Sequence, residues 1–432
     1  MAIDLTWISY VALVVVVYYG FLFALSLLDD RRRQRSYGFK GTRPFFVLVI
    51  PAHNEELVIA QTLSSLGDLD YPDHLVVVMN DGSTDATSEL ARSFEGPTGH
   101  VEVVDRSATV AGQGKGAVLN HAFRRIVEMV ERHDPRLGGR STNDIVIGIV
   151  DADGQLERHT LSAVAELLAE SRVGGVQTGV RIANAEDGLL ARMQDIEFTG
   201  FSSFVQRARD RFSSVGLGGN GQFTRLSALR SLDAEPWTGC LTEDLDLGLS
   251  LVEHGWRIRF CSSASVAQQG LQRLRPLIRQ RTRWIQGHYQ CWRHIPSLLR
   301  ARGQRFATRI DLCAYLLLVA FVMLVFVNVT AGVAEAAGWI DVENHFLSFL
   351  PDGAAKNVIL ELMAFGPILT FFTTYQRRAA RPLAFWEVPA YGFAFAVYGY
   401  VWVAATMWAW LRIALRRGAW AKTQRVAARA AV

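Results

Sequence analysis

Cysteine is scarce in this sequence. Four occur among 432 residues, and none has the Cys-x-x-Cys spacing that would indicate a structural zinc site. Net charge is also low, because 45 Lys and Arg are offset by 41 Asp and Glu to leave +4. The length and the apolar fraction of 50% exclude a small disulfide-stapled domain and a disordered chain. The scarce cysteines fit a reduced catalytic portion facing the cytosol better than a disulfide framework. A net charge of +4 does not by itself indicate a nucleic-acid partner.

Charged residues are absent from the first long apolar run, residues 5–28. At about 1.5 Å per residue, such a helix crosses a hydrocarbon core of about 30 Å. A signal peptide would carry a basic segment before the run and a small-residue cleavage site after it, but Asp29-Asp30-Arg31-Arg32-Arg33 follows instead. We therefore expect a retained transmembrane anchor, with the following residues in the cytoplasm because of the basic cluster.

Further apolar runs at residues 310–333 and 357–375 predict two more transmembrane helices, joined by an acidic and therefore external link. The next segment, 382–411, is interrupted by Pro389, Gly392 and Gly399. It crosses the membrane once or forms a re-entrant hairpin, and the sequence leaves both open. The basic tail, 412–432, lies outside in the first case and inside in the second. We expect a multi-pass protein of the cell membrane, in contact with membrane lipids.

Residues 43–270 form the long soluble stretch, which we expect to be one cytosolic domain. Short β-branched runs alternate in it with helical patterns. The strand candidates are 46–50, 76–79, 101–104 and 145–150, and the helical candidates are 56–66, 84–94 and 115–132. This alternation predicts an α/β fold in which helices cover both faces of a mostly parallel sheet. Ligands bind to such sheets beyond the carboxyl ends of the strands.

Polar residues follow these strands directly. The first is followed by Pro51-Ala52-His53-Asn54-Glu55, the second by Asn80-Asp81-Gly82-Ser83-Thr84-Asp85, and the fourth by Asp151-Ala152-Asp153. Helix capping explains Thr84 and Asp85 well. It explains Asp151 and Asp153 poorly, because their spacing places two carboxylates on one side of an extended backbone. Two such oxygen ligands predict Mg²⁺ or Mn²⁺ bridging a diphosphate.

Two glycine patterns suggest nucleotide motifs. Gly216-Leu217-Gly218-Gly219-Asn220-Gly221 matches G-x-G-x-x-G, but it lies in the middle of the domain rather than after the first strand. We interpret it as a place of close backbone approach to a ligand. Gly114-Lys115-Gly116 resembles part of a phosphate-binding loop, but Thr109 occupies the leading glycine position and Gly116 replaces Ser or Thr.

Acidic residues open a later helix at Thr242-Glu243-Asp244-Leu245-Asp246. Stabilisation of the helix dipole accounts for Asp246. Either of the other two carboxylates could instead be a general base next to the donor.

From Arg257 to Arg309 there are 12 arginines and no acidic residue. We expect 271–309 to be an amphipathic region at an anionic membrane surface. Within it, Gln280-Arg281-Thr282-Arg283-Trp284 offers guanidinium donors for a diphosphate and an aromatic face for a sugar.

Taken together, these residues resemble the membrane-embedded, processive family-2 glycosyltransferases, such as cellulose, hyaluronan, chitin-oligosaccharide and poly-N-acetylglucosamine synthases. The resemblance covers residues 47–284 and the flanking spans. It rests on the ordered set of Asp81, Asp151-x-Asp153, Thr242-Glu243-Asp244 and Gln280-x-x-Arg283-Trp284. It implies a GT-A nucleotide-sugar-binding domain flanked by transmembrane helices, a UDP-sugar donor and inversion at the anomeric carbon.

The resemblance also implies roles for single residues. Asp244 would be the catalytic base, and Asp151 and Asp153 would hold the metal on the diphosphate. Glu243 and Trp284 would contact the acceptor. The expected nucleotide-sugar-binding residues are His53, Glu55, Asp81, Lys115, Asp151, Gln280, Arg283 and Trp284. The segment Trp420-Ala421-Lys422-Thr423-Gln424-Arg425 resembles a tail of some of these enzymes, and it favours the re-entrant topology because it would have to lie near the cytosolic site.

Two acceptors fit this resemblance. The favoured hypothesis is a growing β-linked polysaccharide, possibly exported, and the alternative is a membrane lipid, as in β-monoglucosyldiacylglycerol synthase. About four spans is a small number for a polysaccharide channel. A transporter or receptor is disfavoured, because its spans should carry polar residues and inverted repeats. The sequence does not identify the sugar, the linkage or the oligomeric state.

Overall fold

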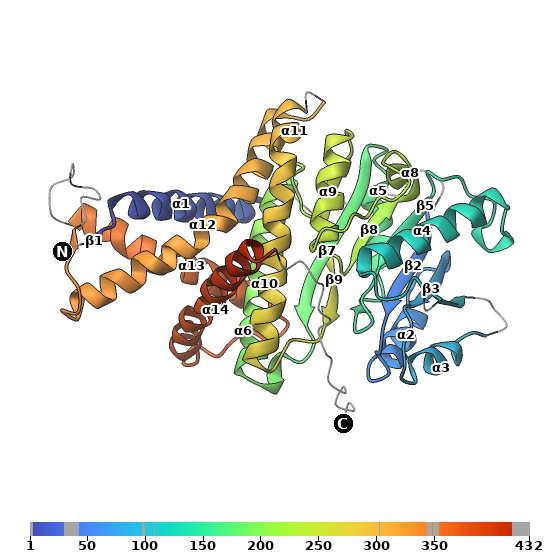
Figure 1. Cartoon of the computed structure of the whole chain (residues 1–432), viewed down its shortest axis with the longest axis horizontal. Helices are drawn as coiled ribbons and strands as arrows, with labels where there is room; N and C mark the ends of the chain where they lie inside the picture. Colours follow the sequence, from blue (N-terminus) through green and yellow to red (C-terminus); the bar gives the residue numbers. More distant parts are fainter. Residues whose placement is uncertain are drawn as a thin grey trace.

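The computed structural model describes residues 3–29, 43–96, 100–107, 109–301, 303–343, 348 and 354–416. Figure 1 shows two parts: an α/β portion on the right, and a group of long helices that extends to the left and includes both α1 and α12. The chain begins in the helical part with α1 (Thr6–Asp29) and then forms the α/β portion. It returns to the helical part with α12 (Phe306–Ala336) and α13 (Ala354–Arg378).

One eight-stranded sheet organises the α/β portion, with strand order β4-β3-β2-β5-β8-β7-β9-β6. Strands β2, β3, β4 and β5 run parallel, and β8 lies antiparallel between β5 and β7. The bounds are β2 Phe45–Ala52, β3 His74–Asn80, β4 Val101–Asp105, β5 Ile145–Ile149, β6 Gln155–Leu156, β7 Val173–Ile182, β8 Gln222–Arg225 and β9 Arg257–Gln268.

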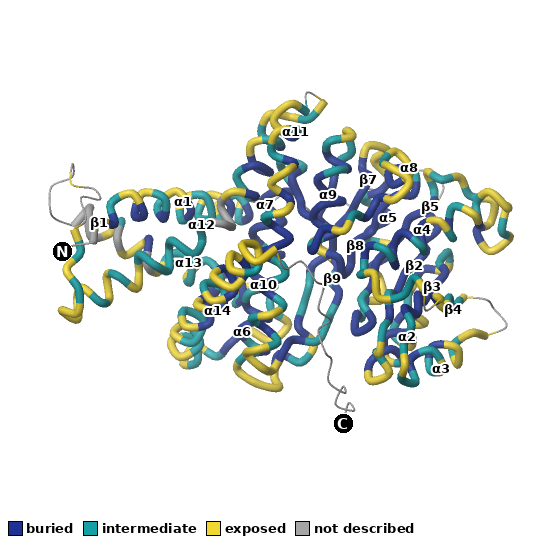
Figure 2. The backbone as a smooth tube through the Cα atoms, viewed as in Figure 1, coloured by how far each residue is buried: buried dark blue, intermediate teal, exposed yellow. Residues whose placement is uncertain are grey.

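Alternate residues of the central strands enter two apolar cores, one on each face of the sheet. Val47 and Val49 of β2 pack with α4 (Lys115–Glu131), whereas Phe46 and Leu48 pack with helices of the other face. Those helices are α2 (Ile59–Gly67) and α5 (Thr160–Leu168), and α3 (Thr87–Arg92) packs against α2. Figure 2 shows the central strands mostly dark blue, as buried, and many outer loops yellow, as exposed.

The structure confirms the predicted α/β fold with a mixed, mostly parallel sheet. All four strand candidates are strands, and the three helical candidates lie at α2, α3 and α4. The other four strands of this sheet, β6, β7, β8 and β9, were not predicted. Strand β8 has four residues, too few for a readable alternation.

The predicted spans coincide with long helices, but α13, which contains the predicted span 357–375, is not among the candidate membrane spans found in the described residues. Among the described residues, α1 and α14 (Val388–Ala414) are long and apolar enough to cross a membrane. Helix α12 would be a third span if its two arms, which meet at 51°, are counted as one. Strand β1 (Ile3–Asp4) pairs in parallel with β10 (Val342–Glu343), so the start of α1 and the link after α12 lie together, far from the sheet.

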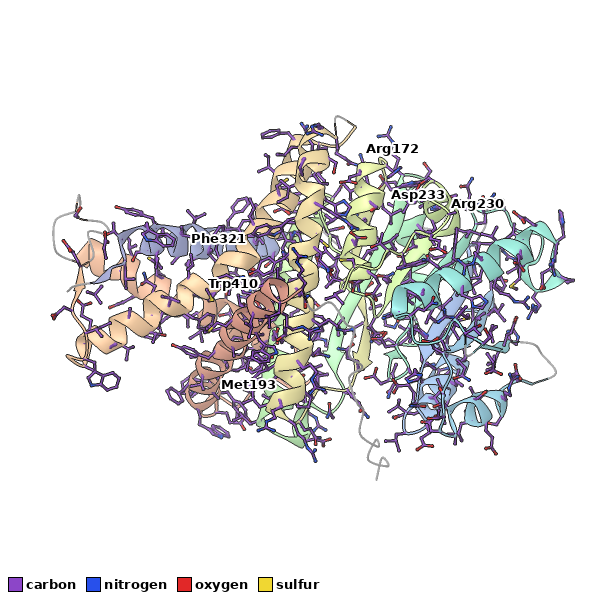
Figure 3. All side chains as sticks on the ribbon, viewed as in Figure 1. Arg172, Met193, Arg230, Asp233, Phe321 and Trp410 are labelled. Carbon is purple, nitrogen blue, oxygen red and sulfur yellow. The ribbon has the colours of Figure 1, made fainter. Side chains whose placement is uncertain are left out.

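Helix α14 is one unbroken helix through Gly392 and Gly399 rather than a hairpin. It packs along α10 (Leu274–Gln290), and Figure 1 shows the two helices side by side. The indole Nε1 of Trp410, labelled in Figure 3, donates to Tyr289 Oη of α10 at 2.9 Å. Membrane crossing by any of these helices stays a prediction. The tail motif 420–425 and the basic cluster 31–35 lie outside the described residues.

Candidate active site

The predicted donor residues that follow strands lie along one edge of the sheet, because β2, β3 and β5 are parallel and end there. Lys115 lies instead on α4, and Gln280, Arg283 and Trp284 lie on α10. His53 follows β2, Asp81 follows β3 and Asp151 follows β5 by two residues. The backbone N–H of Asp81 donates to Ala52 O at 2.8 Å, which fastens the first two strand ends together.

His53 and Asp81 form a second link at this edge. His53 Nδ1 lies 2.7 Å from the carbonyl oxygen of Asp81, so this ring nitrogen carries the proton. The Asp81 carboxylate is buried, pairs with Arg106 Nη1 and accepts the backbone N–H of Gly112 at 3.2 Å. Arg106 follows β4 and was not predicted. The backbone N–H of Glu55 donates to Thr87 Oγ1 at 2.7 Å.

The Asp-x-Asp pair divides its contacts. Asp151 Oδ1 lies 2.6 Å from Lys115 Nζ, at the start of α4. Asp153 is 5% exposed, and its Oδ2 accepts the backbone N–H of Gln269 at 2.8 Å. Asn220 Oδ1 accepts the backbone N–H of Asp151 at 3.1 Å and thereby fixes the loop that carries both carboxylates.

Asp244 and Lys115 meet above the glycine-rich loop 216–221. Gly219 has φ +79°, and a Cβ there would lie 2.9 Å from Asp244 Oδ2 and 3.4 Å from Lys115 Nζ. The loop therefore approaches the two charged side chains closely, and an L side chain at this position would be both strained and crowded. The structure thus gathers three predicted site residues, Asp151, Lys115 and Asp244.

Burial sets the protonation of this group. Burial and the neighbouring charge of Glu243 raise the pKa of Asp244 to about 7, against the opposing positive charge of Lys115. Burial alone would lower the pKa of Lys115, but the negative charges of Asp151, Glu243 and Asp244 raise it above its ordinary value. Near neutral pH, Lys115 is a cation and Asp244 is balanced between acid and base.

Helix α10 lies against the start of α9 (Glu243–Glu253). A Cβ on Gly287 would lie 2.5 Å from the backbone nitrogen of Thr242, so only a glycine permits this approach. The backbone N–H of Leu241 donates to Gln290 Oε1 at 2.9 Å. This packing brings Arg283 of α10 near enough for its charge to act on the pKa of Asp244.

Residues 43–287 match the family model described as "Glycosyltransferase like family 2". The chain belongs to this family of glycosyltransferases. It is 32% identical over 275 residues to a β-monoglucosyldiacylglycerol synthase of Nostoc sp., covering 62% of this chain and 54% of that one. It is 23% identical over 280 residues to a poly-β-1,6-N-acetyl-D-glucosamine synthase of Staphylococcus epidermidis, covering 63% and 61%. The chain thus matches about half the length of the first of these relatives.

The fold has a solved counterpart. A mannosyltransferase from Pyrobaculum calidifontis, determined in complex with GDP-Man and Mn²⁺, superposes with a TM-score of 0.55 at 19% identity. The match covers 91% of this glycosyltransferase and 98% of that chain. Together with the family model, it identifies the sheet and its helices as a GT-A-like domain.

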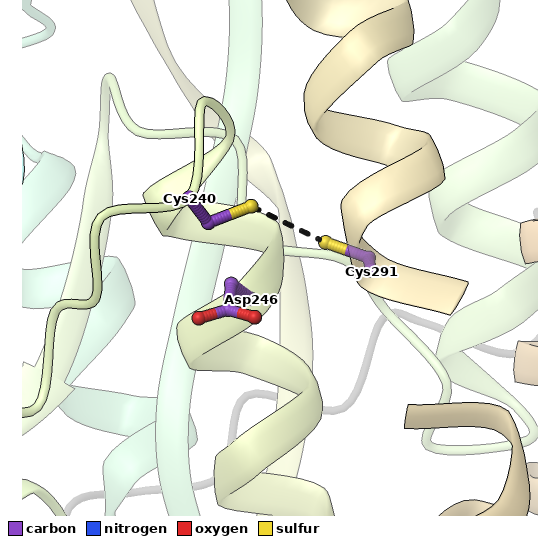
Figure 4. Close-up of side chains that lie close together, drawn as sticks. All are labelled: Cys240, Asp246 and Cys291. Atoms are coloured by element: carbon purple, nitrogen blue, oxygen red, sulfur yellow. Dashed lines mark hydrogen bonds between the residues drawn. The ribbon is translucent and has the colours of Figure 1, made fainter. Parts of the chain in front are cut away.

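Two buried thiols lie behind the site of this glycosyltransferase. Cys240 Sγ is 3.8 Å from Cys291 Sγ, and Asp246 lies beside both (Figure 4). Asp246 already accepts hydrogen bonds from Arg293 Nη2 at 2.6 Å and His294 Nε2 at 2.8 Å. The hydrogen bonds to Asp246 and Glu253 outweigh burial and raise the pKa of His294 to about 9. With two cations on the carboxylate, this cluster suits an anchor between α9 and α10 better than a metal site.

Sequence reasoning missed two contributors and led to a wrong expectation for a third. Arg106 neutralises Asp81, and Asn220 fixes the Asp-x-Asp loop. Arg281, expected among the guanidinium donors for a diphosphate, is completely buried and pairs with Glu197 instead. An arginine two residues before the expected Arg283 gives no sign of its burial, because the whole segment is rich in arginine. Asp246 was interpreted as a helix-dipole acid, and the structure adds its role as an anchor.

Proposed function

We propose that this glycosyltransferase transfers a sugar from a UDP-sugar to a membrane lipid, inverting the anomeric carbon in one in-line displacement. The observation that carries the chemistry is Asp244, a partly buried carboxylate with a pKa of about 7 beside the Lys115–Asp151 pair. A base of that pKa accepts the proton of an acceptor hydroxyl at neutral pH. Glu243, next to it, would contact the acceptor.

The donor would bind along the edge of the sheet. His53, Glu55 and Asp81 would line the nucleoside pocket, where Arg106 and the Gly112 N–H fix the Asp81 carboxylate. Lys115 would lie close to the diphosphate. Gln280, Arg283 and Trp284 would close over the diphosphate and the acceptor end. Guanidinium and ammonium groups stabilise the charge that develops on a departing diphosphate.

The oxygen ligands at the end of β5 fit a divalent cation. Asp151 and Asp153 supply hard oxygen ligands, and an ammonium group, Lys115 Nζ, already lies 2.6 Å from Asp151, as expected where the local potential favours a cation. When bound, Mg²⁺ or Mn²⁺ would supply charge stabilisation to the diphosphate leaving group. The mannosyltransferase of the same fold was determined with Mn²⁺.

The lipid acceptor is favoured over a polysaccharide by the relatives. Identity is 32% to a β-monoglucosyldiacylglycerol synthase but 23% to a poly-β-1,6-N-acetyl-D-glucosamine synthase. The two or three candidate membrane helices among the described residues also suit a lipid acceptor better than a polymer channel. Polysaccharide synthesis is the second candidate, because the Gln280-x-x-Arg283-Trp284 motif resembles that of the processive synthases.

Product size tests this proposal. Purified full-length protein in vesicles that contain diacylglycerol would receive radiolabelled UDP-glucose, with UDP-N-acetylglucosamine and UDP-galactose in parallel. We expect the label in a solvent-extractable glycolipid, from which a β-glycosidase releases the labelled sugar. Label confined to high-mass, glycosidase-sensitive material would favour polysaccharide synthesis. Label in neither fraction, with all three donors bound, would refute both acceptors.

A further inference from the structure

Arg281 is buried completely at the centre of the motif that resembles the family's Gln-x-x-Arg-Trp sequence. Its Nη2 donates to Glu197 Oε2 at 2.8 Å, and its Nη1 donates to Gln280 Oε1 at 2.8 Å. Glu197 belongs to α6 (Leu189–Gly200) and is 84 residues away in the chain. One guanidinium thus joins a distant carboxylate to the side chain of Gln280.

The flat guanidinium also lies against aromatic rings. Its carbon is 4.1 Å from the ring centroid of Trp284 and 5.3 Å from that of Trp402. The other neighbour of Trp284 is Phe198, edge to face at 6.1 Å. Arg281 therefore contacts both Gln280 and Trp284, and cation–π attraction fixes the position of the indole.

Helix α14 contributes a second contact to this guanidinium besides Trp402. Tyr398 of that helix donates its hydroxyl to Glu197 Oε2, and Arg281 Nη2 donates to the Tyr398 hydroxyl at 3.4 Å. Contacts further along α10 follow the same order, since Ile285 packs on Ala405 and Ala409 and Tyr289 bonds to Trp410. The two helices therefore run in the same direction, in contact over most of α10.

A buried guanidinium is costly unless its charge and its donors are matched. Glu197 matches the charge, and Tyr398 fixes the orientation of Glu197. If these contacts of Arg281 served stability alone, its pairing with Glu197 would be enough. The contacts of the same group with Gln280 and Trp284 are the additional observation that links it to the site.

We propose that Arg281, fixed by Glu197 and Tyr398, is a positioning residue that orients Gln280 and Trp284 for sugar transfer. The proposal makes α14 part of the transfer machinery. It rests on the roles proposed above for Gln280 and Trp284. Its consequence is that a change on α14 alters the transfer step while donor binding at the sheet edge is retained.

The sharpest test is Tyr398→Phe with Tyr400→Phe as its matched control. Both remove one hydroxyl from α14, but Tyr400 hydrogen-bonds to Thr330 of α12 at 2.8 Å and does not contact Arg281 in the described contacts. We expect Tyr398→Phe in full-length protein to lower kcat for transfer about tenfold, with the donor KM within about twofold. Tyr400→Phe should leave both within about twofold.

The ratio of transfer to donor hydrolysis separates positioning from general loosening. If Trp284 and Gln280 lose their orientation, water competes better, and we expect the hydrolysed fraction of donor to rise in Tyr398→Phe and in Glu197→Gln. The double variant should lose no more transfer activity than the more impaired of the two single variants, because both changes act through Arg281. Equal losses of transfer and hydrolysis, or equal effects of Tyr398→Phe and Tyr400→Phe, would overturn the proposal.

Three further variants keep the outcome decisive. Thermal unfolding identifies any variant that does not fold. In that case Arg281→Lys is tested in place of the unfolded variant, because lysine keeps the charge but lacks the planar guanidinium group. Gln280→Ala and Trp284→Phe test the roles on which the proposal depends. If these two retain full transfer, the proposed site roles are wrong. If they lose transfer while Tyr398→Phe does not, the positioning inference alone is wrong.

Discussion

Two regions of this glycosyltransferase are built in different ways. One is the sheet edge with His53, Asp81 and Asp151, where we propose that the donor binds (the donor edge), and the other is α10 with its contacts to α6 and α14 (the α10 region). At the donor edge, side chains follow successive parallel strands, and the His53–Asp81 and Asp81–Arg106 contacts span 28 and 25 residues. Around α10, the bonds of Arg281 to Glu197 and Tyr398 span 84 and 117 residues. The first group is placed by strand ends, whereas the second is placed by helices from three parts of the chain.

Because the two regions are built differently, substitutions in them should affect different steps. A substitution at the donor edge should alter donor binding, because the edge is fixed by the sheet whatever the later helices do. A substitution near α9 and α10 should alter the transfer step. Donor-edge variants that changed kcat alone, or variants near α9 that changed only the donor KM, would contradict this division.

The largest effect is expected for Asp244→Asn. Without a base at this position, transfer should fall about 10²–10⁴-fold, while the donor still binds. Because the pKa of Asp244 rises from 3.8 to about 7 on folding, its ionisation costs stability as pH rises through that range. The variant should therefore also unfold at a higher temperature than the wild type at pH 8. Product assays, donor titration and thermal unfolding measure these outcomes, and retained turnover would remove Asp244 from the role.

Removal of divalent metal should be the next largest. Chelation should lower transfer by about a hundredfold or more, because the diphosphate loses a charge partner. Readdition of Mg²⁺ or Mn²⁺ should restore it, and Asp153→Asn should need more metal for half-maximal activity. Activity unchanged by exhaustive chelation would contradict the metal assignment of Asp151 and Asp153.

Gly219→Ala tests the crowding above the glycine loop. The added Cβ would press on Asp244 and Lys115 and would be strained at φ +79°. We expect transfer to fall about tenfold to a hundredfold, with a loss of about 1 kcal/mol in the free energy of unfolding. Gly239→Ala is the control, since nothing lies within 4 Å of its Cβ position. Equal kinetics for the two variants would show that Gly219 does not shape the site.

Arg106→Leu probes the donor edge. It leaves the buried Asp81 carboxylate without its cation, and we expect the donor KM to rise about tenfold while kcat stays within a few-fold. Arg92→Leu is the matched control, because its pair with Asp105 is exposed and contributes little. Kinetics over a range of donor concentrations would decide. A fall in kcat at unchanged KM would contradict the division between the two regions.

The smallest effect concerns pH. If Asp244 is the base, as we propose, it acts only when deprotonated, so transfer should rise with pH and level off above about 7. In Glu243→Gln a negative neighbour is lost, which lowers the pKa of Asp244 and should move this rise by about half a pH unit to lower pH. The position of the rise, not its height, is the measurement. A shift to higher pH would have the wrong sign for the proposed pair.

Much of the donor edge could be predicted from the sequence, since hydrophobic runs followed by Asp, Asn or His mark strand ends. The strands at Phe45–Ala52 and Ile145–Ile149 and the closeness of Asp151 to a cation are of this kind. The contact of Asp81 with Arg106 was not predictable, because nothing local distinguishes Arg106 from other arginines.

The α10 region could be predicted only in outline. The sequence predicted that Gln280, Arg283 and Trp284 act together and that 382–411 is apolar, but not that the two segments meet. The choice of acceptor also changed: the motif suggested a polymer, whereas the relatives favour a lipid.

By itself the sequence determined the α/β sheet, the side of it on which the carboxylates lie and the apolar helices, because side-chain periodicity and strand direction are local properties. The tertiary structure alone decided that Asp244 meets Lys115 above Gly219 and that Tyr398 meets Arg281. Burial determines both, because the pKa of a carboxylate and the value of an ion pair depend on surroundings that distant segments supply.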